Sequence, residues 1–186
     1  MVALDLLEEM NMDIRCAQIA DFDKVVSFYK YVIAKTQGIG EYARWVYGQH
    51  PTDAMILNYI EQKAMFLLEE KQMIVGAMAV TMSQSDDYHC VNWSIDVADD
   101  EVAVIHLLCI NLDYQKQGIG KRMIRESIII AEKERKKTVR LDALASNTPA
   151  RQLYQSLGFK YRGKQHWYAE NTGWTDFLFF EYKTEV

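Results

Sequence analysis

The stretch INLDYQKQGIGKRMI, from Ile110 to Ile124, leads from an apolar run into a segment with helical spacing. Two glycines, Gly118 and Gly120, stand where that helix should begin, beside lysine and arginine residues. The first turn of a helix has amides without intrahelical acceptors and a partial positive charge, so it can bind an anion. Glycine permits a positive φ and a close approach of the ligand. The stretch predicts a site for a phosphate or pyrophosphate, although a tight turn with solvated cations explains Gly-x-Gly alone.

Two other phosphate-binding loops do not fit this stretch. The P-loop requires G-x-x-x-x-G-K-[ST], whereas here the glycines are too close together and Lys121 is followed by Arg122. The dinucleotide-binding fingerprint G-x-G-x-x-G requires a third glycine where the sequence has Met123. Asp142 lies at a suitable distance for the acidic residue of that fingerprint, but the missing glycine would leave a bulky side chain at the contact between helix and strand.

Composition and charge restrict the class of protein. The 186 residues are 49% hydrophobic and 25% charged, which suits one domain over residues 1–186. The net charge of -5 argues against a nucleic-acid-binding surface. Cys16, Cys90 and Cys109 are far apart, and no cysteine–histidine cluster indicates a metal site. The N-terminus has acids where a signal peptide needs cations, and no apolar run is long enough to span a membrane. We expect a cytoplasmic protein with no metal and no nucleic-acid or membrane partner.

Hydrophobic periodicity predicts alternating strands and helices along the chain. We expect a strand in 12–18, a hairpin in 64–83, strands in 102–112 and 138–146, a hairpin in 159–183, and helices in 20–38, 52–63, 118–137 and 147–158. The segment 38–53 is expected to be a loop, and 85–101 an acidic connection with at most an irregular strand. The expected fold class is an α/β (α+β) mixture with a mostly antiparallel sheet.

A second motif is the stretch NTPARQLYQSLGF, from Asn147 to Phe159. Asn147 is suited to cap a helix, proline stands in its first turn, and Gly158 is suited to end it. Together with Q-x-x-G-x-G at 115–120, this motif resembles the GNAT superfamily of acetyl-CoA-dependent N-acetyltransferases, and the order of elements extends the resemblance over nearly the whole chain. Leu112 departs from the proline that many members have at its place. The residues that match the second hallmark of the family are Asn147, Ala150, Leu153, Tyr154, Gly158 and Phe159.

The resemblance implies a sheet of about six to seven strands flanked by about four helices, with splayed central strands. It also implies acetyl-CoA as cosubstrate. The residues that the resemblance assigns to the pyrophosphate turn are Gln115, Lys116, Gln117, Gly118, Ile119, Gly120 and Lys121. It assigns the pantetheine to the strand edge at Leu108, Cys109 and Ile110, whose backbone would pair with it as with an added strand. Asn147 would contact CoA as well as cap its helix.

The same resemblance implies direct attack of an amine on the thioester, with Tyr154 as the acid that protonates the leaving thiolate. A base must neutralise the amine, and two residues are candidates. His106 lies in the apolar strand with the same parity as Leu108 and Ile110, and Glu101 lies at the start of that strand. The alternative is that His106 is a core histidine, that Glu101 is a solvated acid and that Tyr154 is an aromatic residue that only packs in the core.

Cys109 is interpreted as a core residue and not as a nucleophile, because no neighbour in the sequence activates it and direct transfer needs no acyl-enzyme. The amide of Ile110 is instead expected to polarise the thioester carbonyl.

The acceptor is less well defined by the sequence. Aromatic residues suit a pocket for an apolar or cationic amine, and the acids between Asp86 and Glu101 are either a solvated surface or a region that attracts cations. We expect a small amine, an amino acid or a peptide amine as acceptor, and a homodimer is possible. The alternative is a non-catalytic CoA-binding sensor with the same fold. The aromatic and histidine residues expected near the acceptor are Tyr42, Trp45, Tyr47, His50, Tyr88, His89, Trp93, His166, Trp167, Tyr168 and Trp174.

Overall fold

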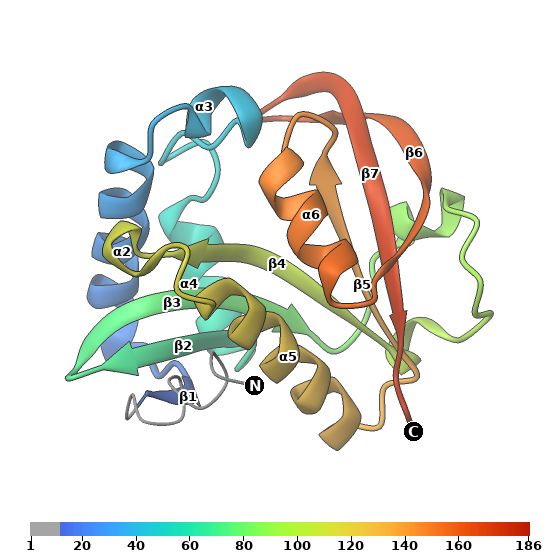
Figure 1. Cartoon of the computed structure of the whole chain (residues 1–186), viewed down its shortest axis with the longest axis horizontal. Helices are drawn as coiled ribbons and strands as arrows, with labels where there is room; N and C mark the ends of the chain where they lie inside the picture. Colours follow the sequence, from blue (N-terminus) through green and yellow to red (C-terminus); the bar gives the residue numbers. More distant parts are fainter. Residues whose placement is uncertain (1–11) are drawn as a thin grey trace.

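The structure of the protein is a computed structural model that describes residues 12–186. Its strands form one seven-stranded sheet in the order β1-β2-β3-β4-β5-β7-β6 (Figure 1). The strands are β1 (Asp13–Cys16), β2 (Met65–Glu70), β3 (Met73–Thr81), β4 (Val102–Ile110), β5 (Thr138–Leu144), β6 (Lys160–Ala169) and β7 (Gly173–Lys183). All neighbouring pairs are antiparallel except β4 and β5, which are parallel. The expected mixed, mostly antiparallel sheet is confirmed.

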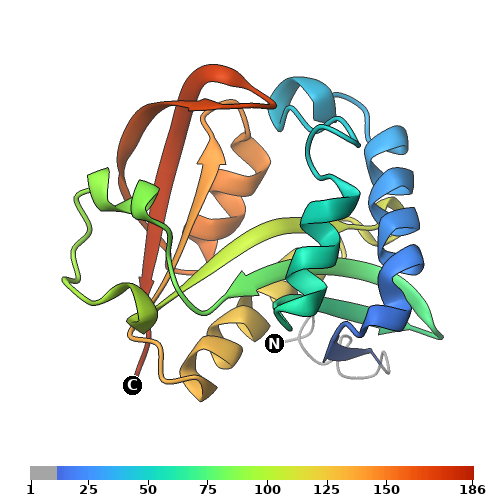
Figure 2. The same ribbon diagram turned by 180° about the vertical axis from the view of Figure 1, so that it is seen from behind.

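Helices cover both faces of the sheet. The helices are α2 (Phe22–Lys35), α3 (Ile39–Tyr42), α4 (Asp53–Glu61), α5 (Ile119–Lys133) and α6 (Thr148–Ser156). Helices α2 and α4 lie on one face and α5 and α6 on the other, as Figures 1 and 2 show from opposite sides. The short helix α3 was not expected, because the segment 38–53 was predicted to be a loop. The helix begins after Gly38, whose φ is 76°.

Two further expectations concern targeting. Across residues 12–186, no helix combines the length and the apolar character that a membrane crossing requires. The expectation that the chain has no signal peptide rests mainly on residues 1–11, which lie outside the described residues.

The strands β4 and β5 diverge after a short stretch of pairing. They pair only through Val102, Ala103 and Val104 of β4. Beyond that point β4 stays paired with β3 as far as Ile110, and β5 stays paired with β7 as far as Leu144. The expected splayed central strands are therefore present, and the edge of β4 that faces β5 is left without a neighbouring strand.

A β-bulge interrupts β4 within this open stretch. Leu107 and Leu108 lie opposite a single residue of β3, Met78, and Leu107 has a φ of 52°. The extra residue reverses the alternation of side chains. Ile105 therefore packs in the core beneath α5, whereas Leu107 packs in the core beneath α2 and α4.

A tyrosine of α2 supports the bulge. Tyr29 is fully buried, and its hydroxyl donates a hydrogen bond of 2.7 Å to the carbonyl of Leu107. A buried carbonyl without a partner is destabilising, so this bond compensates for the local loss of ladder pairing at the bulge.

A buried ion pair holds the connection between β3 and β4 against the sheet. Arg140 of β5 pairs with Glu181 of β7 at 3.0 Å, and both side chains are almost completely buried. Arg140 also donates to the carbonyl of Ile95 at 2.7 Å. Glu181 accepts from the amide of Ser94 at 3.0 Å and pairs with Arg162 at 2.9 Å. These bonds fix the connection, which forms the 3₁₀ turns η2 (Asp86–Cys90) and η3 (Asp99–Glu101) in place of an irregular strand.

The bulge contact leads to a test of stability. Tyr29→Phe removes the donor to the Leu107 carbonyl, and we expect it to lower the free energy of unfolding by about 1–2 kcal/mol. Tyr31→Phe, at an exposed position of the same helix, is the matched control and should have little effect. Urea denaturation of both variants measures the difference, and equal stability of the two would show that the hydrogen bond does not support the bulge.

Candidate active site

A cavity of about 430 Å³ lies where β4 and β5 diverge. Its walls come from α2, α3, β4, β5 and α6, and from the turn between β6 and β7. Tyr154 and His106 both line this cavity. Five further residues that the resemblance assigned to the cosubstrate line it as well. These are Leu108, Cys109, Ile110, Gln115 and Asn147.

The turn before α5 has the backbone of an anion site. Gly118 has a φ of 85° and Lys116 a φ of 61°, so left-handed residues alternate with others before the helix begins. The amide of Arg122 makes a helical hydrogen bond of 3.0 Å to the carbonyl of Gly118. Since the first amides of an α-helix have no acceptor within the helix, the amides of 119–121 are left for an anion.

Glycine is required at Gly118 and at Gly120 for different structural reasons. Gly118 is needed for its left-handed φ. Gly120 has no left-handed φ, and a Cβ there would lie 3.3 Å from Cδ2 of Leu153 on α6. Its small size therefore serves the close packing of α5 against α6, which holds the anion turn close to Leu153 of α6.

The other polar side chains assigned to the cosubstrate are either exposed or hydrogen-bonded to nearby backbone. The side chain of Gln117 donates to the carbonyl of Asp113 at 2.7 Å, and Lys116 and Lys121 are exposed. Asn147 caps α6 as expected, since its Oδ1 accepts from the amide of Ala150 at 3.2 Å.

The open edge of β4 presents backbone to the cavity. The amide of Asn111 donates to the carbonyl of Val75 in β3 at 2.9 Å. Because successive amides of a strand point in opposite directions, the amide of Ile110 points away from β3 and towards the open side. Burial raises the pKa of the Cys109 thiol to about 12, although the Ile110 amide opposes this shift, so the thiol is protonated near neutral pH.

Tyr154 projects from α6 into the cavity. Its ring packs against Phe159 and Phe180, with centroid separations of 6.1 and 5.9 Å. Its hydroxyl has no hydrogen-bond partner among residues 12–186. Burial, and then the charge of Asp142, raise the pKa of Tyr154 well above its ordinary value. The phenol is therefore protonated and free to donate.

His106 also lines the cavity, but the predicted parity was wrong. Its ring stacks on Tyr59 of α4 at 5.8 Å, whereas Leu108 and Ile110 pack in the core on the α5 side. The bulge reverses the side-chain alternation between His106 and Leu108, which strict alternation along the strand could not foresee. Burial, and then the nearby His50, lower the pKa of His106 to about 4, so its imidazole is neutral near pH 7.

The structure does not bring Glu101 to the cavity. Its carboxylate pairs with Lys137 at 2.5 Å and accepts from the amide of Ala98 at 3.1 Å, and neither partner lines the cavity. Glu101 is close in sequence to the cavity residues of β4. However, it precedes the part of β4 that is still paired with β5, and the cavity lies beyond that pairing.

Asp142 is a cavity residue that the sequence analysis did not assign to the site. It lies on β5, and its Oδ1 accepts a hydrogen bond of 2.7 Å from the Tyr88 hydroxyl. Burial raises the pKa of Asp142, while the bond from Tyr88 opposes the shift. An acid within the alternating stretch TVRLDALAS was the available signal, because a carboxylate in an apolar strand requires a reason.

Of the aromatic and histidine residues expected near the acceptor, Tyr42, Trp45 and His50 line the cavity. The remaining ones lie elsewhere. Trp93 and Tyr88, for example, stack on each other at 5.6 Å in the core beneath the β3–β4 connection.

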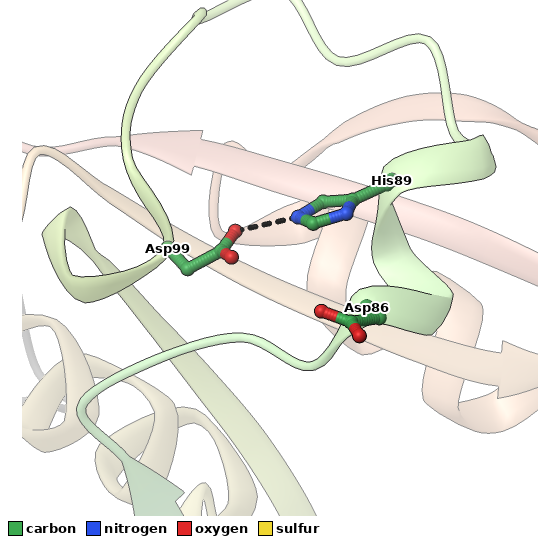
Figure 3. Close-up of side chains that lie close together, drawn as sticks. All are labelled: Asp86, His89 and Asp99. Carbon is green, nitrogen blue, oxygen red and sulfur yellow. Dashed lines mark hydrogen bonds and ion pairs between the residues drawn. The ribbon is translucent and has the colours of Figure 1, made fainter.

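A separate cluster lies on the β3–β4 connection, where Asp86, His89 and Asp99 have potential ligand atoms within 4.8 Å of one another (Figure 3). His89 Nε2 and Asp99 Oδ1 are 2.8 Å apart. Because exposed acidic groups of this kind occur commonly without a bound ion, the cluster alone does not define a metal site.

Comparison with known proteins places the chain in a family. Residues 35–159 match the model of the acetyltransferase (GNAT) family, which is most of the chain. The protein therefore belongs to the GNAT acetyltransferase family, as the resemblance implied.

Relatives and solved structures agree with this assignment. The [ribosomal protein bS18]-alanine N-acetyltransferase of Escherichia coli is 39% identical over 57 residues, which is 31% of this chain and 38% of the relative. An uncharacterized N-acetyltransferase of Methanocaldococcus jannaschii is 33% identical over 69 residues, which is 37% of this chain and 30% of the relative. The matched segments thus span well under half of the curated relatives.

Among solved structures, a GNAT-family acetyltransferase from Streptococcus agalactiae superposes with a TM-score of 0.78 at 18% identity, covering 94% of this chain and 96% of that one. A putative acetyltransferase from Salmonella typhimurium, solved with acetyl-CoA, superposes with a TM-score of 0.68 at 18% identity, covering 95% of each chain. At these identities the superpositions establish the fold.

The raised pKa of Asp142 predicts a pH-dependent difference in stability. The folded-state pKa of Asp142 is raised above its unfolded value, so the stability it contributes is lost as the pH rises through the folded pKa. Asp142→Asn keeps an acceptor for Tyr88 and removes the charge. We expect its free energy of unfolding, relative to wild type, to increase from pH 4 to pH 8.

Denaturation with urea at several pH values measures this effect, with Asp96→Asn as the control at an exposed position. A relative stability of Asp142→Asn that falls with rising pH would contradict a raised pKa at Asp142.

Proposed function

We propose that this protein transfers an acetyl group from acetyl-CoA to a primary amine by direct attack. The observation that carries the proposal is the convergence of Tyr154, Asn147 and the open edge of β4 on one cavity, beside an anion-binding turn. Membership of the GNAT family supports the chemistry.

The residues present fit the proposed cosubstrate. The amides of 117–121 and the left-handed Gly118 would hold the diphosphate, and Lys116 would add charge at the surface. The backbone of 108–110 would pair with the pantetheine amides, because no strand within residues 12–186 occupies that edge of β4. Acetyl-CoA supplies the acetyl group as a thioester.

The cavity residues supply the polar groups of the transfer. The amide of Ile110, which points to the open side of β4, stabilises the negative charge that develops on the carbonyl oxygen. The Tyr154 hydroxyl donates its proton to sulfur as the C–S bond breaks. It regains a proton from the nitrogen as the amide forms, so the phenol is restored.

The acceptor amine must lose a proton before it attacks. A lysine-like amine has a pKa near ~10.4 and is almost fully protonated at neutral pH. His50, His106 and Asp142 line the cavity and can accept this proton, directly or through water. Burial raises the pKa of Asp142, which makes its carboxylate a better proton acceptor than an exposed one, and lowers the pKa of His106 to about 4, which makes its imidazole a weaker acceptor.

The alternative function is a CoA-binding sensor without catalysis. It explains the anion turn but gives no role to a protonated, unpartnered Tyr154 hydroxyl within the cavity. The enzyme is therefore the function that the geometry supports best.

Tyr154→Phe tests the proposed acid. We expect kcat to fall by about 10²–10⁴-fold, because the leaving thiolate loses its proton donor, while coenzyme A affinity is kept. A thiol-release assay measures kcat and calorimetry measures affinity. Tyr161→Phe, at an exposed position of β6, serves as the control. Unchanged turnover would remove Tyr154 from the mechanism, and CoA binding by wild type without turnover of any amine would support the sensor.

Gly118→Ala tests the anion turn. The φ of 85° is unfavourable for alanine by about 1–2 kcal/mol, so relaxation of the turn should displace the amides that hold the diphosphate. We expect coenzyme A to bind about tenfold more weakly in calorimetry. Gly163→Ala changes another glycine with positive φ, on β6, and should leave binding intact. Equal affinities of the two variants would place the diphosphate elsewhere.

A further inference from the structure

The cavity is lined by very few charged side chains. Of the residues described as lining it, Asp142 is the one acid, and none is a lysine or an arginine. The two histidines are neutral near pH 7, because burial lowers the pKa of His50 and lowers that of His106 to about 4. A ligand in this cavity therefore meets one carboxylate and no cation.

Aromatic rings line the same cavity as this carboxylate. Tyr59 of α4 and Tyr154 of α6 line the cavity together with Asp142. Burial, and then the charge of Asp142, raise the pKa of both hydroxyls. Trp45 adds a third ring to the lining and packs against His50 at 5.9 Å. A carboxylate among aromatic faces is a site for an ammonium group attached to an apolar body.

The cavity is also bounded at the end where α3 meets the β6–β7 turn (Figure 1). The Arg44 guanidinium donates to the carbonyl of Thr172 at 2.5 Å, and the Ser146 hydroxyl donates to the carbonyl of Tyr42 at 2.8 Å. These bonds join α3 to the opposite half of the molecule. The cavity of about 430 Å³ must also admit the reactive end of the cosubstrate, so the space left for an acceptor is small.

We propose that the acceptor is a small primary monoamine with an apolar or aromatic body and no carboxylate, and that Asp142 holds its ammonium group. This inference rests on the proposed function. A free α-amino acid would place its carboxylate in a cavity that contains a negative charge and no cation. A diamine would bury a second ammonium without a second carboxylate. A peptide amine carries no adjacent carboxylate, but its chain would have to pass the end where the bonds of Arg44 and Ser146 join α3 to the opposite half of the molecule.

Matched acceptors test the substrate class. With saturating acetyl-CoA, 2-phenylethylamine is compared with phenylalanine, pentylamine with 1,5-diaminopentane, and both monoamines with a short peptide that begins with alanine. We expect kcat/KM for each monoamine to exceed that of its charged partner and of the peptide by about 100-fold or more. Equal or better use of phenylalanine, the diamine or the peptide would overturn the proposal.

The role of Asp142 is tested by binding as well as by rate. N,N-dimethyl-2-phenylethylamine, a tertiary amine that cannot form a stable amide, should inhibit competitively with the acceptor. In Asp142→Asn we expect its inhibition constant to rise at least about tenfold, while coenzyme A affinity by calorimetry is unchanged. Asp96→Asn should match wild type, and Asp142→Glu should recover part of the inhibition. An unchanged inhibition constant in a folded Asp142→Asn protein would exclude the carboxylate as the anchor.

The outcomes separate this proposal from the proposed function. If coenzyme A binds and no acceptor is acetylated, both the proposed function and this inference fail. If acetylation occurs and favours an amino acid, a diamine or a peptide, the transferase stands and only the acceptor class is wrong.

Discussion

The end of the pairing between β4 and β5 is the constraint on which the rest of the structure depends. After Val104 the two strands follow different neighbours, and the backbone of β4 loses its partners on one side. The space between the strands becomes the cavity, and the free edge becomes a place for a ligand that can pair with a strand. The β-bulge at Leu107 interrupts this open stretch, and the hydrogen bond from Tyr29 to the Leu107 carbonyl stabilises it.

Strand β5 carries two charged residues, Arg140, which is buried, and Asp142, which is partly exposed to the cavity. Arg140 is fully paired, with Glu181 and with the carbonyl of Ile95, and its role is to hold the β3–β4 connection in place. Asp142, two residues later, accepts from Tyr88 and otherwise faces the cavity. Tyr88 itself belongs to the connection that Arg140 fixes. Arg140 thus positions Tyr88, which is the hydrogen-bond partner of Asp142. In the acceptor site proposed above, the Asp142 carboxylate binds a cationic ligand.

The sequence allowed more of the fold to be predicted than of the site. Local rules located the cap at Asn147 and the left-handed Gly118, because both depend on residues close in the chain. The bulge could not be predicted, since Leu107 is an ordinary apolar residue in an apolar run. The parity of His106 was wrong for that reason. Asp142 was not assigned to the site because its role depends on the divergence of β4 and β5, which no local pattern encodes.

A crystal structure of the protein with coenzyme A is the most direct test of the central claim, that the divergent strands form the transfer site. The account predicts diphosphate density on the first turn of α5 and the sulfur between β4 and β5, within hydrogen-bonding distance of the Tyr154 hydroxyl. Coenzyme A bound elsewhere, or β4 and β5 paired beyond Val104 with the cavity closed, would contradict it.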